Sequence, residues 1–305
     1  MWWLWTVFLA VVICGVAIDI RALGKEYSLP DYRRSVRVVA VWVSAAMLFG
    51  LLICGKLGRD PWMKFIGGYA LELSLAVDNL FVFMAVFAYF KITGVAQRKA
   101  LTYGIIGAIL MRVFFIFAGV ALLNKFKWLT YVFGALLIAS AFGMFRVGSG
   151  AEQSRPLLVK LAKLLKIKRG RSELQFFVKH GGRWYATRLF ACVVAVEMAD
   201  IVFSADSVPA ILAITREPLL VCSSNIFAII GLRALYTLLT RLISRFHLLK
   251  YGVATVLMFI GLKMSFAEIY HISTGASIAV IGATLIGTIA ASFFTGGRVN
   301  FTERS

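Results

Sequence analysis

Long apolar runs joined by short basic connections make up most of the chain. Nine runs are long enough to cross a bilayer, at about residues 1–18, 36–55, 65–90, 100–123, 128–145, 186–214, 219–240, 249–269 and 277–294. A helix needs roughly 20 apolar residues to cross the hydrocarbon core. The runs are continuous and do not alternate, which favours helices over a transmembrane barrel. We therefore expect an all-α polytopic membrane protein with nine transmembrane helices.

The composition agrees with this pattern, and the positions of the charges predict an orientation. The chain has 61% hydrophobic and 15% charged residues and a formal net charge of +19. With the N-terminus outside, 24 of the 33 Lys and Arg residues fall on the inner side; the outer connections hold Lys56, Arg59, Lys64, Lys125, Lys127 and Arg216, and the spans hold Arg112, Arg233 and Lys263. Basic residues concentrate in cytoplasmic loops, so we predict N-out and C-in, with multi-pass insertion in a bacterial inner membrane.

The longest polar connection, residues 147–185, is strongly basic. Leucines at helical spacing alternate there with cations, among them Lys160, Lys163, Lys166, Lys168, Arg169 and Arg171. This pattern is typical of a helix on an anionic membrane surface, so we predict a cytoplasmic loop that contacts lipid. Nucleic-acid binding is the alternative, and we do not expect it because the topology already accounts for the charge. Residues 176–185, with Gly181 and Gly182 at their middle, predict a small hairpin.

Two acidic motifs occupy equivalent places in two of the spans. ELSLAVDNL at 72–80 aligns without a gap with DIVFSADSV at 200–208, and the aligned pairs are Glu72 with Asp200, Asp78 with Asp206, and Asn79 with Ser207. A carboxylate at the centre of a spanning helix costs at least about 2.5–3.5 kcal/mol, which makes a functional role the default interpretation.

The likeness between the two regions extends over three spans. Arg112 follows the first motif in the next span, Arg233 follows the second, and Tyr131 and Tyr251 open the span after each. Units of three spans enter the membrane from opposite sides, so we predict an inverted repeat of units 61–146 and 186–270, preceded by two helices in 1–60 and followed by a last helix in 271–305.

Helix geometry limits how these acids can meet. Within each motif the two acids are six residues apart, which places them roughly 120° apart around a straight helix. Pro209 removes the hydrogen bond to the carbonyl of Ala205, so we predict a broken helix beside Asp206.

The predicted ligand set contains only oxygen donors. It comprises Glu72, Asp78, Glu197, Asp200 and Asp206 with Asn79 and Ser207, and the candidate charge partners are Arg112, Arg233 and Lys263. Three cations leave a deficit of about two charges, which suits a hard divalent ion such as Mn²⁺, Mg²⁺ or Ca²⁺. The alternative is that the acids pair with Arg112 and Arg233 only to hold helices together, or stay protonated. The four cysteines and three histidines lack the spacing of a zinc or disulfide site, and no nucleophile with a base is visible, so we expect no enzymatic activity and no resident cofactor.

With ELSLAVDNLFVF, VEMADIVFSADSVPAI, SNIFAIIGLRALY and LLKYG in view, the chain resembles the TerC family, near its Alx branch. The resemblance implies a nine-span inner-membrane protein linked to manganese efflux and, in some members, to tellurium resistance. It also implies that the acidic positions and their polar neighbours named above are the functional ones.

These observations predict an exporter of Mn²⁺ that works by alternating access, with Asp78 and Asp206 as central ligands and carboxylates that exchange protons. The competing hypothesis is a membrane scaffold or assembly factor for envelope stress or tellurite resistance that transports nothing and uses the basic loop as its working surface. The sequence names no protein partner.

Overall fold

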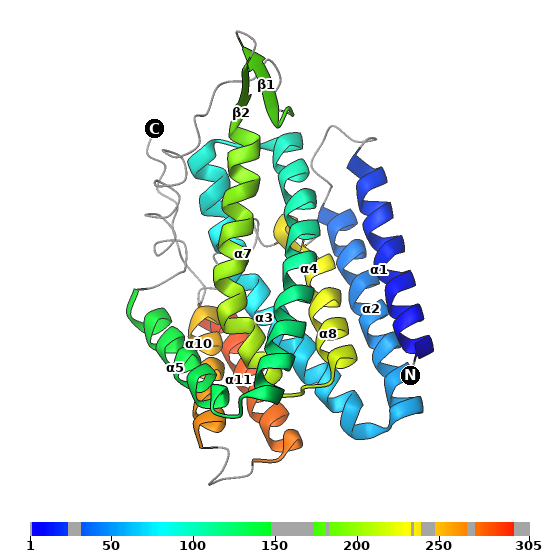
Figure 1. The fold of residues 1–305 in the computed structure, drawn as a ribbon, viewed down its shortest axis with the longest axis vertical. Helices are drawn as coiled ribbons and strands as arrows, with labels where there is room; N and C mark the ends of the chain where they lie inside the picture. Colours follow the sequence, from blue (N-terminus) through cyan, green and yellow to red (C-terminus); the bar gives the residue numbers. More distant parts are fainter. Residues whose placement is uncertain are drawn as a thin grey trace.

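The computed structural model describes residues 2–23, 32–147, 174–180, 183–232, 235–238, 248–266 and 272–295. The described chain is a bundle of helices with one two-stranded hairpin (Figure 1). Its elements are α1 (Trp2–Leu23), α2 (Tyr32–Leu57), α3 (Arg59–Phe90), α4 (Gly94–Lys125), α5 (Leu129–Val147), β1 (Phe177–His180), β2 (Arg183–Ala186), α7 (Arg188–Leu212), α8 (Pro218–Ile230), α10 (Leu249–Ser265) and α11 (Thr274–Thr295).

Each expected span overlaps one of these helices. Four stretches are long and apolar enough to cross a membrane by themselves: Ser35–Leu57, Arg59–Phe90, Gly94–Lys125 and Thr274–Ser292. Shorter apolar helices cover Trp2–Ala17, Leu129–Phe145 and Pro218–Ile230. The sequence prediction of an all-α membrane protein is therefore confirmed at this level, and the hairpin is the one non-helical element in the described chain.

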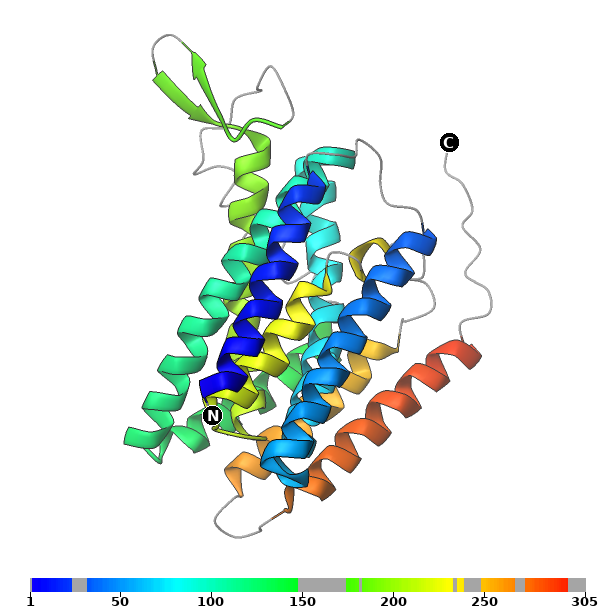
Figure 2. The same cartoon turned by 90° about the vertical axis from the view of Figure 1, so that its right-hand side faces the viewer.

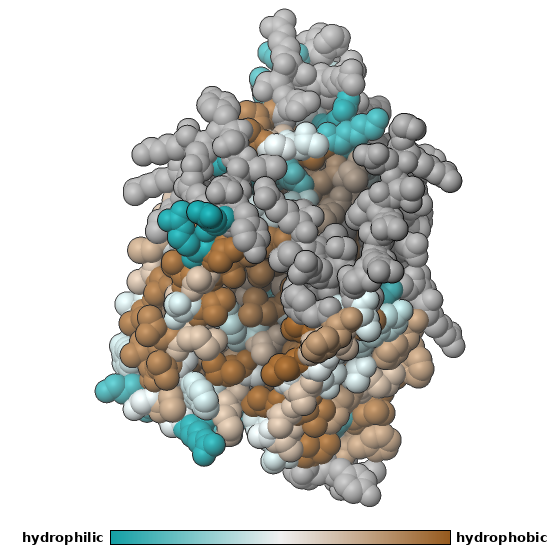
Figure 3. Space-filling view, turned by 180° about the vertical axis from the view of Figure 1, so that it is seen from behind, coloured by the Kyte–Doolittle hydropathy of each residue, from teal (hydrophilic) through white to brown (hydrophobic). Residues whose placement is uncertain are grey.

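Large apolar side chains remain on the outside of the bundle. Leu110, Val202 and Ile286 are 66%, 56% and 70% exposed, and Figure 3 shows apolar residues over much of the described surface on the face opposite to Figure 1. A soluble protein rarely exposes so much contiguous apolar surface, whereas a membrane protein turns it towards lipid.

The hairpin and the turn between α3 and α4 lie at one end of the bundle. The connections α2–α3, α4–α5 and α7–α8 lie at the other end (Figures 1 and 2). The hairpin confirms the sequence prediction: His180 pairs with Arg183 across the two glycines, and Phe177 pairs with Ala186. The α2–α3, α4–α5 and α7–α8 connections are those that were predicted to lie outside the cell.

Helices α3, α4 and α5 pack against α7, α8 and α10 in matching combinations. α4 contacts α7 and α3 contacts α8, while α3 contacts α7, α4 contacts α8 and α5 contacts α10. If α3, α4 and α5 are replaced by α7, α8 and α10, and the reverse, these same pairs of helices are in contact.

The directions of these helices follow from which residues meet. α5 and α10 are antiparallel, because Phe145 stacks on Tyr251 near one end and Gly134 lies against Gly261 farther along. α4 and α7 are parallel, because Gly104 faces Val196 and Gly119 faces Leu212. The first helix of the second set thus runs in the same direction as the second helix of the first set.

The apolar core consists of three clusters. One lies towards the hairpin and joins α3, α4 and the start of α7. A second joins α1 and α2 to the start of α3, the ends of α4 and α7, and α8. The third joins α5, α10 and α11 to the middle of α3 and the end of α7. The middle parts of α3, α4, α7 and α8 lie where these clusters meet.

The break predicted in α7 is absent, and the adjacent α8 is the shorter helix. α7 is helical from Arg188 to Leu212, with Pro209 inside its last turn, so the hydrogen bond lost at the proline falls where the helix ends. α8 ends at Ile230 and Gly231 lies in a turn. The 13 residues of α8 span only about 20 Å, which is less than the thickness of the hydrocarbon core of a bilayer.

Candidate functional site

Four helices each contribute one polar side chain to a buried cluster at the centre of the bundle. These side chains are Glu72 of α3, Arg112 of α4, Asp200 of α7 and Asn225 of α8, which are 1%, 1%, 3% and 0% exposed. The guanidinium of Arg112 donates to Oε1 of Glu72, and its Nη1 also donates to Oδ1 of Asn225 at 2.9 Å. Its Nη2 donates to Oδ1 of Asp200 at 3.5 Å. We call these four residues the arginine cluster.

The location of the arginine cluster follows from the apolar residues around it. On α4, Ala108 belongs to the core near the hairpin and Ile116 to the core near α1, so Arg112 lies between the two cores. On α8, Ile229 belongs to the core near the hairpin and Ile226 to the core near α1. Four polar side chains thus meet in a layer that is sealed by apolar residues above and below.

Asn225 was missed in the sequence analysis. Its amide nitrogen donates to Oε2 of Glu72 at 3.0 Å, so both oxygens of Glu72 are hydrogen-bonded. The available signal was an amide inside SSNIFAII, an apolar segment that is entirely buried. A buried amide needs partners, and that rule would have marked it as a candidate.

The arginine cluster contains atoms without a hydrogen-bond partner. Oδ2 of Asp200 and Nε of Arg112 are buried and unpartnered in the described chain, as is Oγ of Ser207 one and a half to two turns further along α7. Two carboxylates against one guanidinium leave one excess negative charge when all three are ionised. The site therefore has spare oxygen donors and spare negative charge in a low-dielectric interior.

Asp206 lies on another face of α7. Its Oδ1 accepts a hydrogen bond from the hydroxyl of Ser140 on α5 at 2.5 Å. Asp200 is bonded to α4, so the two acids of this motif point to different neighbours, as the 120° separation predicts. The structure does not bring them into one cage.

Glu197, one turn before Asp200, packs against α4. Its carboxylate lies against Gly107, where an added Cβ would collide with both carboxylate oxygens. A side chain at position 107 would therefore force the carboxylate of Glu197 to move.

Several predicted residues lie outside the described part of the structure. The side chain of Asp78 is one, although its backbone lies in α3. Others are Arg233 and the basic loop residues Lys160, Lys163, Lys166, Lys168, Arg169 and Arg171. Asn79, which is part of the first motif, is buried.

Lys263 does not join the acids. Its ammonium donates to the hydroxyl of Ser277 on α11 at 2.7 Å, and it lines a pocket at the end of the bundle. Within the described residues, no three acidic, histidine or cysteine side chains converge closely enough to hold a metal ion together. The acids on α7 instead form a series at 197, 200 and 206 that extends about 13 Å along the helix.

Comparisons with known proteins find membrane proteins as relatives of this chain. A family model described as "Integral membrane protein TerC family" matches residues 57–300. The chain is 36% identical to "Putative membrane-bound redox modulator Alx" of Escherichia coli, over 98% of this chain and 95% of that protein. It is 37% identical to an uncharacterized membrane protein of Myxococcus xanthus over 95% and 91% of the two chains, and 39% identical to the chloroplastic thylakoid membrane protein TERC of Arabidopsis thaliana over 92% and 72%. No solved structure matches this chain.

Proposed function

The chain belongs to the TerC family of integral membrane proteins, and from this premise we propose that it exports a divalent metal ion, principally Mn²⁺, from the bacterial cytoplasm. The observation that carries the proposal is the arginine cluster with its unpartnered Asp200 oxygen. Burying two carboxylates is costly, and one guanidinium repays only part of that cost. A divalent cation is the ligand that such a surplus of oxygen donors and negative charge suits.

The donor set favours a hard metal ion. Glu72, Asp200 and Asp206 provide carboxylate oxygens, while Ser140 and Ser207 provide hydroxyls. The four cysteines are free thiols on four different helices and take no part in the proposed site. Carboxylate and hydroxyl ligands suit Mn²⁺ or Mg²⁺ better than copper or zinc.

In this proposal, the guanidinium of Arg112 competes with the metal ion for the carboxylate oxygens. This guanidinium bridges Glu72 and Asp200, the same oxygens that a cation approaching between α3 and α7 would need. Asp200 is held at 3.5 Å by one oxygen only, so it is the carboxylate that is easiest to release. We propose that the metal engages Asp206 and Asp200 in turn, and that Arg112 returns to Asp200 when the metal leaves.

The matching contacts of the two helix sets support alternating access. The reversed direction of the second set and the exchangeable contacts are what an inverted repeat of 61–146 and 186–270 would produce. In such transporters the substrate site lies where the repeats meet, and the arginine cluster draws residues from both. We propose the N-out, C-in orientation in the inner membrane, with Asp78 as a further ligand and proton exchange on the carboxylates.

Metal flux in liposomes tests the proposal. Purified wild-type protein should transport Mn²⁺, and Asp206→Asn should lose most of that flux because an amide is a neutral, weaker ligand. Asp60→Asn is the matched control, since Asp60 is an exposed acid paired with Lys64 at the start of α3. Wild-type flux in a well-folded Asp206→Asn variant would remove Asp206 as a ligand.

The scaffold hypothesis predicts a different result. Under it, deletion of residues 154–171 should abolish the cellular phenotype, and neither the wild-type protein nor the deletion variant should carry Mn²⁺ in liposomes. If the wild-type protein is folded and carries no divalent ion at all, the transporter proposal fails and the scaffold remains.

A further inference from the structure

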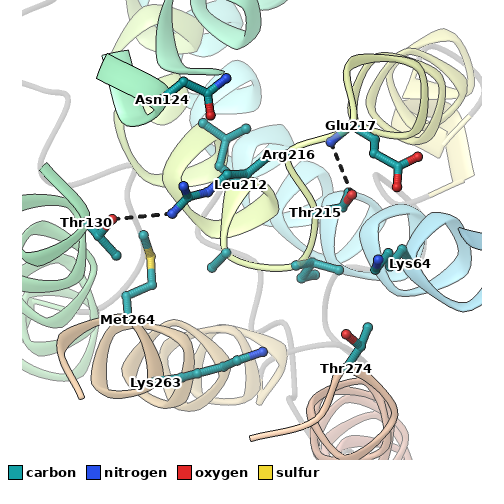
Figure 4. A pocket seen from close by; sticks show the side chains of 12 residues that line it. Lys64, Asn124, Thr130, Leu212, Thr215, Arg216, Glu217, Lys263, Met264 and Thr274 are labelled. Carbon is teal, nitrogen blue, oxygen red and sulfur yellow. Dashed lines mark hydrogen bonds between the residues drawn. The ribbon is translucent and has the colours of Figure 1, made fainter. Parts of the chain in front are cut away.

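A polar pocket lies at the end of the bundle opposite to the hairpin. On α3 and α7 its lining residues Lys64 and Leu212 are at least two helical turns from the residues of the arginine cluster. The pocket has a volume of about 490 Å³ and forms where the α7–α8 connection meets the start of α3, the end of α10 and the start of α11 (Figure 4). Because residues of α3, α4, α5, α7, α10 and α11 line it together with that connection, it is a feature of the assembled bundle.

Three cationic side chains surround this pocket. Lys64 comes from α3, Arg216 from the α7–α8 connection and Lys263 from α10, and Figure 4 shows them on three sides of it. Among the described lining residues, Glu217 is the one carboxylate. The lining therefore has a net charge of about +2 at neutral pH.

The polar contacts of these cations leave capacity for an anion. Arg216 donates to the hydroxyl of Thr130 at 3.4 Å and Lys263 to the hydroxyl of Ser277 at 2.7 Å, both of which are neutral partners. Lys64 pairs with Asp60 one turn away. In the described chain neither Arg216 nor Lys263 forms a salt bridge with a carboxylate, so both retain donors for a charged acceptor.

An apolar hollow shares Lys263 with the polar pocket. It has a volume of about 290 Å³ and is lined by Phe259 and Leu262 of α10, by Phe266 directly after that helix and by Ile272. Leu262 and Phe266 are 43% and 49% exposed, so this hollow opens to the outside of the bundle. A lysine places its apolar stem along such a surface while its ammonium reaches the polar side.

We propose that the two hollows together bind one anionic phospholipid. Its phosphate lies among Lys64, Arg216 and Lys263, with the hydroxyls of Thr130, Thr215 and Thr274 nearby, and an acyl chain covers the apolar face of α10. Arginine and lysine are the usual partners of phosphate, which every phospholipid headgroup carries. Inorganic phosphate shares the headgroup chemistry and would use the cationic pocket alone. The adjoining apolar hollow favours the lipid.

Lipid binding to the full-length protein, measured by native mass spectrometry and by thermal stabilisation in detergent, tests the proposal. We expect phosphatidylglycerol to bind and to stabilise the protein more than phosphatidylcholine with the same acyl chains. Replacing two cations in Arg216→Gln/Lys263→Gln should weaken phosphatidylglycerol binding roughly 30-fold, at about fivefold for each charge. Phe266→Ala should weaken lipid binding without changing binding of inorganic phosphate.

The matched control is Lys125→Gln/Lys127→Gln. It removes two exposed cations at the same end of the bundle, one from the last turn of α4 and one from the α4–α5 connection, and neither residue lines the pocket. Unchanged binding in this control, with loss in the pocket variant, supports the site. Equal loss in both variants, equal binding of the two lipids, or inorganic phosphate that stabilises the protein as much as the lipid would overturn it. Each variant is first shown to unfold at the wild-type temperature without added lipid, which separates loss of the site from loss of the fold.

Discussion

Glu72 on α3 and Asp200 on α7 occupy aligned positions in the two helix sets, yet their surroundings differ. Glu72 has both oxygens bonded, one to Arg112 and one to Asn225. Asp200 has one oxygen at 3.5 Å from Arg112 and a second oxygen that is buried and unpartnered. Two residues at aligned positions thus have different environments: both oxygens of Glu72 are hydrogen-bonded, whereas Asp200 keeps one buried oxygen without a partner in the described chain.

The largest effect should come from the residue that joins the two sets. Arg112→Ala leaves Glu72 and Asp200 buried without a counter-charge, and we expect about 3–5 kcal/mol of destabilisation. Arg112→Lys keeps the charge but loses the fork that reaches two acids, so its loss should be intermediate. Thermal unfolding in detergent measures both. An Arg112→Ala variant as stable as wild type would show that the acids are neutral and that the cluster is held by packing.

The pair Glu72→Gln and Asp200→Asn tests the difference between the sets directly. Glu72→Gln weakens bonds at both oxygens and should cost about 1.5–3 kcal/mol, whereas Asp200→Asn should cost clearly less. Mn²⁺ flux should fall strongly in Asp200→Asn at near wild-type stability. Unfolding temperature and flux are measured on the same preparations. Equal losses of stability would mean that the two positions are equivalent after all.

A smaller effect should come from the contact between α5 and α10. A Cβ on Gly261 would lie 2.8 Å from the backbone oxygen of Gly134, which cannot give way as a side chain does. We expect Gly261→Ala to cost about 1–3 kcal/mol through strain between the two sets. Gly282→Ala on α11 is the control, because open space surrounds that position. Similar unfolding temperatures for the two variants would show that α5 and α10 separate without cost.

Much of the architecture was predictable from the chain alone. Continuous apolar runs predicted helices at the right places, because a backbone in lipid must satisfy its own hydrogen bonds. Gly181 and Gly182 between two short strands predicted the hairpin. The six-residue spacing of Asp200 and Asp206 predicted that they lie on different faces of α7, and their partners on α4 and α5 confirm it.

The proline in α7 was a misleading signal. Its effect depends on how far the helix continues, and α7 ends three residues later. The described chain has a turn at Gly231, after α8 and not within α7. A glycine within an apolar run is a weaker signal of a helix end than a proline is.

The amino-acid sequence by itself determined that carboxylates are buried in spanning helices, that they occur at matching positions, and that an arginine follows the first motif within the next span. Only the tertiary structure decided which of them meet: Glu72 finds Asn225 at a distance of 153 residues along the chain, Asp206 finds Ser140, and Lys263 turns to the end of the bundle. The physical reason is that helix period and hydropathy depend on neighbours within a few turns. The meeting of side chains from different helices depends instead on the depth, rotation and direction at which whole helices pack.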